Sequence, residues 1–130
     1  MTTLALRKAL NTDYDTALLR VPEALKSEGF GVLTEIDIQA TLKQKIGADF
    51  RRYKILGACN PTFAHEALQT EIEAGLMLPC NVVVYEDGDH AVVLMIDPTK
   101  TAGASGNPRL KPLAEAVRAK LERALDKLEE

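Results

Sequence analysis

The two cysteines are the residues whose type and placement most directly suggest chemistry. Cys59 and Cys80 are the only cysteines among the 130 residues, and an asparagine follows each of them. Cys59 stands directly before a predicted helix start, where backbone N–H groups and the helix dipole favour a thiolate. Neighbouring strands would let the two sulfurs act as a redox pair, a soft-metal site or a lone reactive thiol. The simpler interpretation is that both are small buried hydrophobic residues, which is the usual state of free cysteine.

Of the two asparagines that follow the cysteines, only one has a structural role that the sequence makes clear. Asn60 precedes Pro61 and has a sufficient structural role as a helix N-cap. Asn81 has no such role, so its amide either satisfies a loop carbonyl or orients a ligand.

Two carboxylates form a second possible constellation. Glu35 and Asp37 lie on one face of a predicted strand, with side chains about 7 Å apart by strand geometry. Such a pair can perform acid–base chemistry or hold a cation. The alternative is a solvated sheet face, because unpaired carboxylates are mostly exposed.

Familiar enzyme and metal motifs are missing from the sequence. There is no CxxC, and the two cysteines with His65 and His90 do not show the spacing of a zinc site. No GxGxxG, P-loop, GxSxG or HExxH occurs. We therefore expect no metal and no cofactor. We expect a pocket between sheet and helices near the cysteines, with these candidate residues: Cys59, Asn60, Cys80, Asn81, Glu35 and Asp37.

Length, composition and charge bound the class of protein. The chain fits one domain over 1–130, and 46% apolar with 27% charged residues predicts a folded protein. The net charge is -3 and no basic cluster exceeds Arg51-Arg52, which argues against nucleic-acid binding. No apolar run approaches 18 residues, so no membrane span is expected. Without a secretory signal or a disulfide framework, the cytoplasm is the expected compartment.

The hydrophobic periodicity predicts five strands and four helices. Alternation indicates strands, and three- to four-residue spacing indicates helices. The last helix carries a long apolar stripe that includes Val117 and Leu121, and the helix over 61–72 carries one that includes Leu68 and Ile72. The expected strands cover 3–10, 31–38, 50–58, 81–86 and 90–96; the helices cover 13–28, 39–46, 61–72 and 108 onward; 101–107 is expected to be a mobile loop.

This order, β-α-β-(α)-β-α-β-β-α, predicts an α+β two-layer sandwich around a mainly antiparallel sheet. The hairpin strands 82–85 and 91–96 are apolar at both parities, although one face of such a sheet normally meets water. Both faces near the hairpin therefore need cover. The chain's own helices, an apolar ligand or a second subunit would each supply it, and we expect a homodimer.

Four phrases carry a family resemblance. They are Glu28-Gly29-Phe30-Gly31-Val32-Leu33, Thr34-Glu35-Ile36-Asp37, Tyr53-Lys54-Ile55-Leu56-Gly57-Ala58-Cys59-Asn60-Pro61 and Leu78-Pro79-Cys80-Asn81-Val82-Val83-Val84-Tyr85. Together they resemble the bacterial and archaeal family known as domain of unknown function 302. The resemblance implies a TATA-binding-protein-like fold with a curved antiparallel sheet, and a homodimer. It implies no activity, and the fold name does not imply DNA binding.

Two functional hypotheses follow. The first is a dimeric small-ligand binding or structural module with its pocket near Cys59 and Cys80. The alternative is a thiol-dependent enzyme or redox protein that uses one of these cysteines. Burial of the two sulfurs discriminates between them, because a buried thiol is inert and an accessible one at a helix start is a candidate nucleophile.

Overall fold

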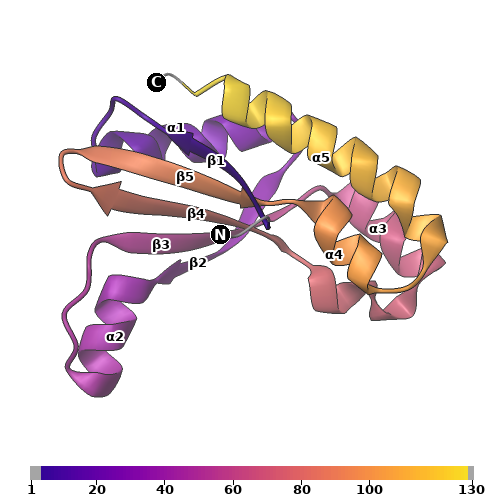
Figure 1. The fold of residues 1–130 in the computed structure, drawn as a ribbon, viewed down its shortest axis with the longest axis horizontal. Coiled ribbons are helices and arrows are strands. Elements are labelled where there is room, and N and C mark those ends of the chain that lie inside the picture. Colours follow the sequence, from indigo (N-terminus) through magenta and orange to yellow (C-terminus); the bar gives the residue numbers. More distant parts are fainter. Residues whose placement is uncertain (1–3, 129–130) are drawn as a thin grey trace.

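A five-stranded antiparallel sheet with helices forms the molecule (Figure 1). The structure is a computed structural model that describes residues 4–128, so Thr3 of the first predicted strand lies outside the described residues. The spatial strand order is β1-β5-β4-β3-β2, and every neighbouring pair is antiparallel. The strands are β1 (Ala5–Ala9), β2 (Gly31–Asp37), β3 (Tyr53–Cys59), β4 (Cys80–Asp87) and β5 (His90–Ile96). The predicted α+β two-layer architecture is confirmed, while the TATA-binding-protein-like curvature stays a prediction.

Local capping signals set the starts of most helices. The Asp13 carboxylate accepts a hydrogen bond from the Thr16 N–H at 2.8 Å, and the helix continues through Pro22. Asp37, Asn60 and Asp97 cap the following helices in the same way. The helical segments are α1 (Tyr14–Ser27), α2 (Ile38–Ile46), α3 (Pro61–Thr70), the 3-10 helix η1 (Ile72–Met77), α4 (Pro98–Ala104), the 3-10 helix η2 (Pro108–Leu110) and α5 (Lys111–Asp126).

The hydrophobic core lies between one face of the sheet and the helices α1 and α5. Figure 1 shows both helices on the same side of the sheet. The core unites the inward side chains of α1 and α5 with alternate residues of the strands. Its fully buried members include Val21, Leu121, Val82, Val84, Val93 and Met95. We call this side of the sheet the covered face.

The residues of opposite parity form a second face, which we call the open face. Ile36, Ile55, Val83 and Leu94 pair directly across four adjacent strands. Ile36 is 47% exposed, and the other three are half-buried. Val92, although on this face, is fully buried beside its cross-strand partners on β4 and β1. The helices α1 and α5 therefore cover one face of the hairpin, and of the three alternatives for cover, helices on both faces is not what the structure shows.

Two segments differ from the sequence-based expectation. The predicted loop over 101–107 is largely the helix α4, which Asp97 caps and which packs against α5. Its small residues give no apolar periodicity, so tertiary packing decides its conformation. The predicted stripe over 61–72 breaks at its end, because Ile72 begins η1 and is 81% exposed. Within residues 4–128, no helix is both long and apolar enough to cross a membrane.

Candidate functional site

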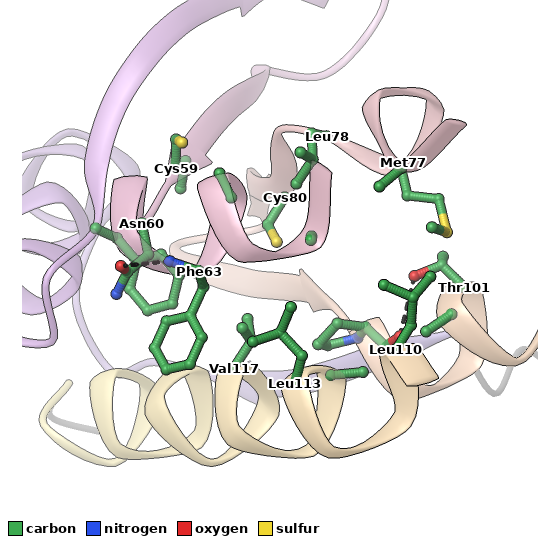
Figure 2. Close-up of a pocket in the computed structure, with 18 residues that line it drawn as sticks. Cys59, Asn60, Phe63, Met77, Leu78, Cys80, Thr101, Leu110, Leu113 and Val117 are labelled. Carbon is green, nitrogen blue, oxygen red and sulfur yellow. Dashed lines mark hydrogen bonds between the residues drawn. The ribbon is translucent and has the colours of Figure 1, made fainter. Parts of the chain in front are cut away.

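An apolar cavity lies where α3, η1, α4 and α5 meet the ends of β3 and β4 (Figure 2). Its volume is about 70 Å³, against the roughly 10–15 Å³ that one water requires on a comparable measure. The lining comes from segments far apart in sequence, from Phe30 to Val117. The predicted pocket near the two cysteines thus coincides with a cavity at the helical end of the sheet.

Small side chains create this cavity. Six of its lining residues are alanines: Ala58, Ala64, Ala67, Ala74, Ala102 and Ala114. Larger residues form the rest of the wall, including Phe63, Met77, Leu110 and Leu113. Because alanine fills little volume, the backbones of α3, α4 and α5 can approach without closing the space between them.

The polar groups at the cavity wall are already engaged by the protein. The Asn60 side chain accepts from the Phe63 N–H at 3.5 Å and donates to the Glu28 carbonyl at 3.4 Å. The Thr101 hydroxyl donates to the Pro98 carbonyl at 3.2 Å. A ligand here would therefore meet hydrocarbon and sulfur rather than free hydrogen-bonding groups. This lining favours an apolar ligand or the apolar part of an amphipathic one.

Cys80 is the buried cysteine, and it lines this cavity. It is 8% exposed and pairs with Ala58 at the start of β4. Figure 2 shows its sulfur directed toward α5, on the side of Val117 and Leu113. Burial, and to a lesser degree the neighbouring Cys59, raises the pKa of the Cys80 thiol to about 11. At neutral pH this thiol is protonated, so it behaves as a small hydrophobic group and a poor nucleophile.

Cys59 has a different environment. It ends β3, pairs with Gly31 and is half-buried. Its sulfur points away from that of Cys80 in Figure 2, and both cysteines are free thiols. Asn60, the next residue, is the N-cap of α3. Cys59 therefore keeps the position at a helix start that suggested reactivity.

The two asparagines separate in space as well as in role. Asn60 caps α3 and lines the cavity. Its position also depends on Gly29, because a Cβ there would lie 2.9 Å from the Asn60 amide nitrogen. Asn81 is exposed on β4, where it pairs with Gly57 on the open face, and it is not part of the cavity lining.

The two carboxylates have separate structural partners away from the cavity. Glu35 accepts a hydrogen bond from Lys54 Nζ at 2.7 Å. Asp37 caps α2 by accepting from the Ala40 N–H at 2.9 Å. The structure therefore brings Cys59, Asn60 and Cys80 together at the cavity and places Glu35 and Asp37 on the edge strand β2. Across residues 4–128, no group of three or more His, Cys, Asp or Glu side chains could hold a metal ion.

Sequence reasoning missed much of the cavity wall. Met77, Pro98 and Thr101 come from segments that were not predicted as helical walls, and Leu110 lies in the short helix η2. One signal was present, since Ala64 and Ala67 recur at helical spacing beside Phe63. A small-residue stripe of this kind leaves space against a neighbouring element, but it does not show which element that is.

Together these features define a small two-layer α+β domain with an apolar cavity at the helical end of its sheet. A family model described as "Domain of unknown function DUF302" matches residues 6–128, so the chain belongs to this family. The chain is also similar to a solved structure titled "Crystal structure of uncharacterized conserved protein DUF302 from Bacillus stearothermophilus". That protein is 32% identical, the match covers 98% of this chain and 100% of the other, and the TM-score is 0.91. No curated protein matches the chain.

Proposed function

We propose that the protein is a cytoplasmic, dimeric small-ligand binding module whose cavity takes an apolar small molecule or an apolar chain. The observation that carries this proposal is the lining itself, which combines six alanines with larger apolar residues and leaves polar groups already bonded. Apolar cavities of this kind stay dry and bind apolar guests of matching size. Two free thiols agree with a reducing compartment.

The homodimer part of the proposal draws on the open face. Its row of Ile36, Ile55, Val83 and Leu94 is contiguous across four strands. A contiguous apolar patch on a small protein is costly to leave in water and usually marks an interface. Light scattering at micromolar concentration should give twice the chain mass of 14.2 kDa. A monomer that persists at millimolar concentration would contradict this part.

Filling the cavity tests the ligand proposal. Ala67 lines the cavity from α3, so Ala67→Leu places three more carbon atoms in it. We expect the affinity for an uncharged probe, N-phenyl-1-naphthylamine, to fall at least about tenfold, because each buried methylene needs its own volume. The matched control is Ala119→Leu on the exposed side of α5, which should leave probe binding unchanged. Equal probe binding by both variants and the unaltered protein would place the probe elsewhere and overturn the proposal.

The second candidate is a thiol-dependent enzyme or redox protein, and the burial of Cys80 favours Cys59 as the residue it would use. Cys59 is half-buried at the start of α3, whereas Cys80 is buried with a raised pKa. Alkylation of the native protein between pH 5 and 9, followed in Cys59→Ser and Cys80→Ser variants, separates the two sulfurs. Slow labelling of both until unfolding supports the binding module. Fast labelling of Cys59 near pH 6 would favour the thiol enzyme instead.

A further inference from the structure

We propose that a second copy of this chain docks on the open face so that α2 of each protomer lies against the α3–η1 end of the other. This inference rests on the homodimer proposed above and adds the surfaces that form it. Three independent features carry it: the open face, the helix α2, and the opposite charges at the two ends of the molecule.

The open face supplies an apolar centre. Beyond the isoleucine, valine and leucine row, Tyr53 and Tyr85 stack on the same face with ring centroids 5.8 Å apart. Phe50, 44% exposed, packs against Tyr53 at 5.9 Å. Sheets that pack face to face bury such rows at a spacing of about 10 Å. The cover that these residues need is not provided by α1 or α5, which pack on the covered face.

The helix α2 packs only partly against its own chain, on β2 and β3, and Gln39 Nε2 donates a hydrogen bond to the Phe50 carbonyl at 3.0 Å. None of its nine residues, all of them described, is buried. Figure 1 shows α2 projecting from the end of the sheet on the side away from α1 and α5. Its last residue, Ile46, is 73% exposed. An isolated helix of this length is marginal in water, so it gains stability only from tertiary or quaternary contacts.

Charge distinguishes the two ends of the molecule. The last turn of α2 carries Lys43 and Lys45. The α3–η1 end carries Glu66, Glu71 and Glu73, and Arg109 of η2 lies beside Glu66, so acidic residues outnumber basic ones there. This acidic end also exposes apolar side chains, since Ile72 and Leu76 are 81% and 87% exposed. A basic, apolar tip and an acidic, apolar end are complementary in both respects.

A two-fold axis brings these surfaces together. In Figure 1, α2 lies at one end of the long axis and α3 at the other. A two-fold axis that runs parallel to the sheet and perpendicular to the strands, just beneath the open face, exchanges the two ends and turns the open faces toward each other. Each α2 then projects toward the partner's α3–η1 end, and the interface is isologous, with the same contact made twice.

The open face alone is smaller than a stable interface, so the α2 contacts must contribute to it. Five strands about 4.8 Å apart and about 20 Å long present roughly 500 Å² of plan area. A stable interface buries about 800 Å² on each partner. The sheet face alone falls short of that area, and the two α2 contacts extend it.

Charge reversal tests the interface directly. Lys45→Glu and Glu73→Lys should each raise the dimer dissociation constant about tenfold, because each places like charges together twice in the dimer. The double variant Lys45→Glu/Glu73→Lys should recover most of the affinity. The matched control is Lys26→Glu, since Lys26 lies in the last turn of α1 on the other side of the sheet. Sedimentation equilibrium at low salt gives the constants, and thermal unfolding checks that each variant folds.

Hydrogen exchange gives a second measurement that does not depend on substitutions. Amides of residues 39–46 should become protected as the protein concentration rises through the dimer dissociation constant. Only in the dimer does α2 contact the α3–η1 end of the second protomer. If Lys45→Glu weakens the dimer no more than Lys26→Glu does, the interface is elsewhere and this inference is wrong while the dimer stands. A wild-type monomer at millimolar concentration would overturn both proposals together.

Discussion

The two faces of the sheet carry the same kinds of apolar residue, but the helices α1 and α5 bury only one of them. Val82 and Val84 on β4 are fully buried under α1 and α5, whereas Val83, between them, is half-buried on the open face. The same alternation separates Val93 from Leu94 on β5. A shift of one residue along a strand moves a side chain from one face to the other. Apolar composition therefore marks residues that need cover, and the placement of the helices decides which of them form the core.

Charged side chains also differ between the two sides of the sheet in how well they are satisfied. On the covered face, Lys8 Nζ donates to the Leu128 and Leu125 carbonyls at 2.6 Å and 3.3 Å and so satisfies the end of α5. Glu28 similarly joins α1 to α5 through Lys127 and Arg123, which hold the pKa of its carboxyl below the usual range. Near α2, both side chains of the Lys43–Asp49 ion pair are exposed. Exposed ion pairs of this kind contribute little stability.

Truncation of the core should have the largest effect. Leu121 is fully buried on α5, so Leu121→Ala should lower the free energy of unfolding by about 2–5 kcal/mol. The matched control is Leu19→Ala, because Leu19 lies on α1 and is 75% exposed. Chemical denaturation should show a change below about 0.5 kcal/mol for this control. Similar losses for both variants would show that the covered face is not the core.

The buried thiol of the covered face should give a pH-dependent contribution. Burial raises the folded-state pKa of Cys80 from its ordinary value of 9.0 to about 11, so the unfolded chain loses its proton first as pH rises. The stabilising contribution is complete below pH 9 and is lost progressively toward pH 11, up to about 2–3 kcal/mol. The Cys80→Ala variant should not show this pH-dependent loss of stability, because it has no thiol to titrate. Identical pH profiles for the two proteins between pH 9 and 11 would contradict the burial of this sulfur.

On the open face, neighbouring side chains leave no room for a Cβ at Gly57. A Cβ at this position would overlap Thr34 Oγ1 and lie 2.8 Å from Pro79 Cγ. Gly57→Ala should therefore lower the free energy of unfolding by about 1–3 kcal/mol through overpacking. Gly103→Ala is the control, since nothing lies within 4 Å of its Cβ and alanine favours the helix α4. Equal thermal stabilities of the two variants would show that Pro79 can move away from β3.

Truncation of a residue in the open-face row should have the smallest effect on the stability of the monomer. At nanomolar concentration, Val83→Ala should lower the free energy of unfolding by less than about 1 kcal/mol, because its side chain is only half-buried. Val82→Ala, one residue earlier and fully buried, should cost more. At concentrations where the dimer forms, Val83→Ala should also weaken association. A larger monomer cost for Val83 than for Val82 would reverse the assignment of the two faces.

Local signals in the sequence determined the order and type of most elements. The hairpin follows from two apolar runs around Asp87-Gly88-Asp89, and β4 and β5 join there as predicted. Helix starts at Asp13 and Asn60 follow from capping residues, whose hydrogen bonds span only three residues. The pairing of Cys59 and Asn60 with Cys80 at one site was also predictable, because it needed only that β3 and β4 be neighbours.

Tertiary structure decided the features that depend on distant parts of the chain. The sequence contains Leu68, Ile72 and Leu76 as apolar residues at helical spacing, yet all three are exposed, because α5 faces the opposite side of α3 and η1. The helix α4 exists beside α5 without a periodic pattern of its own. Likewise, the two-sided apolar hairpin indicated that both faces need cover but not which face the helices take. Periodicity records how apolar a side of an element is, whereas the partner of that side is set by long-range packing.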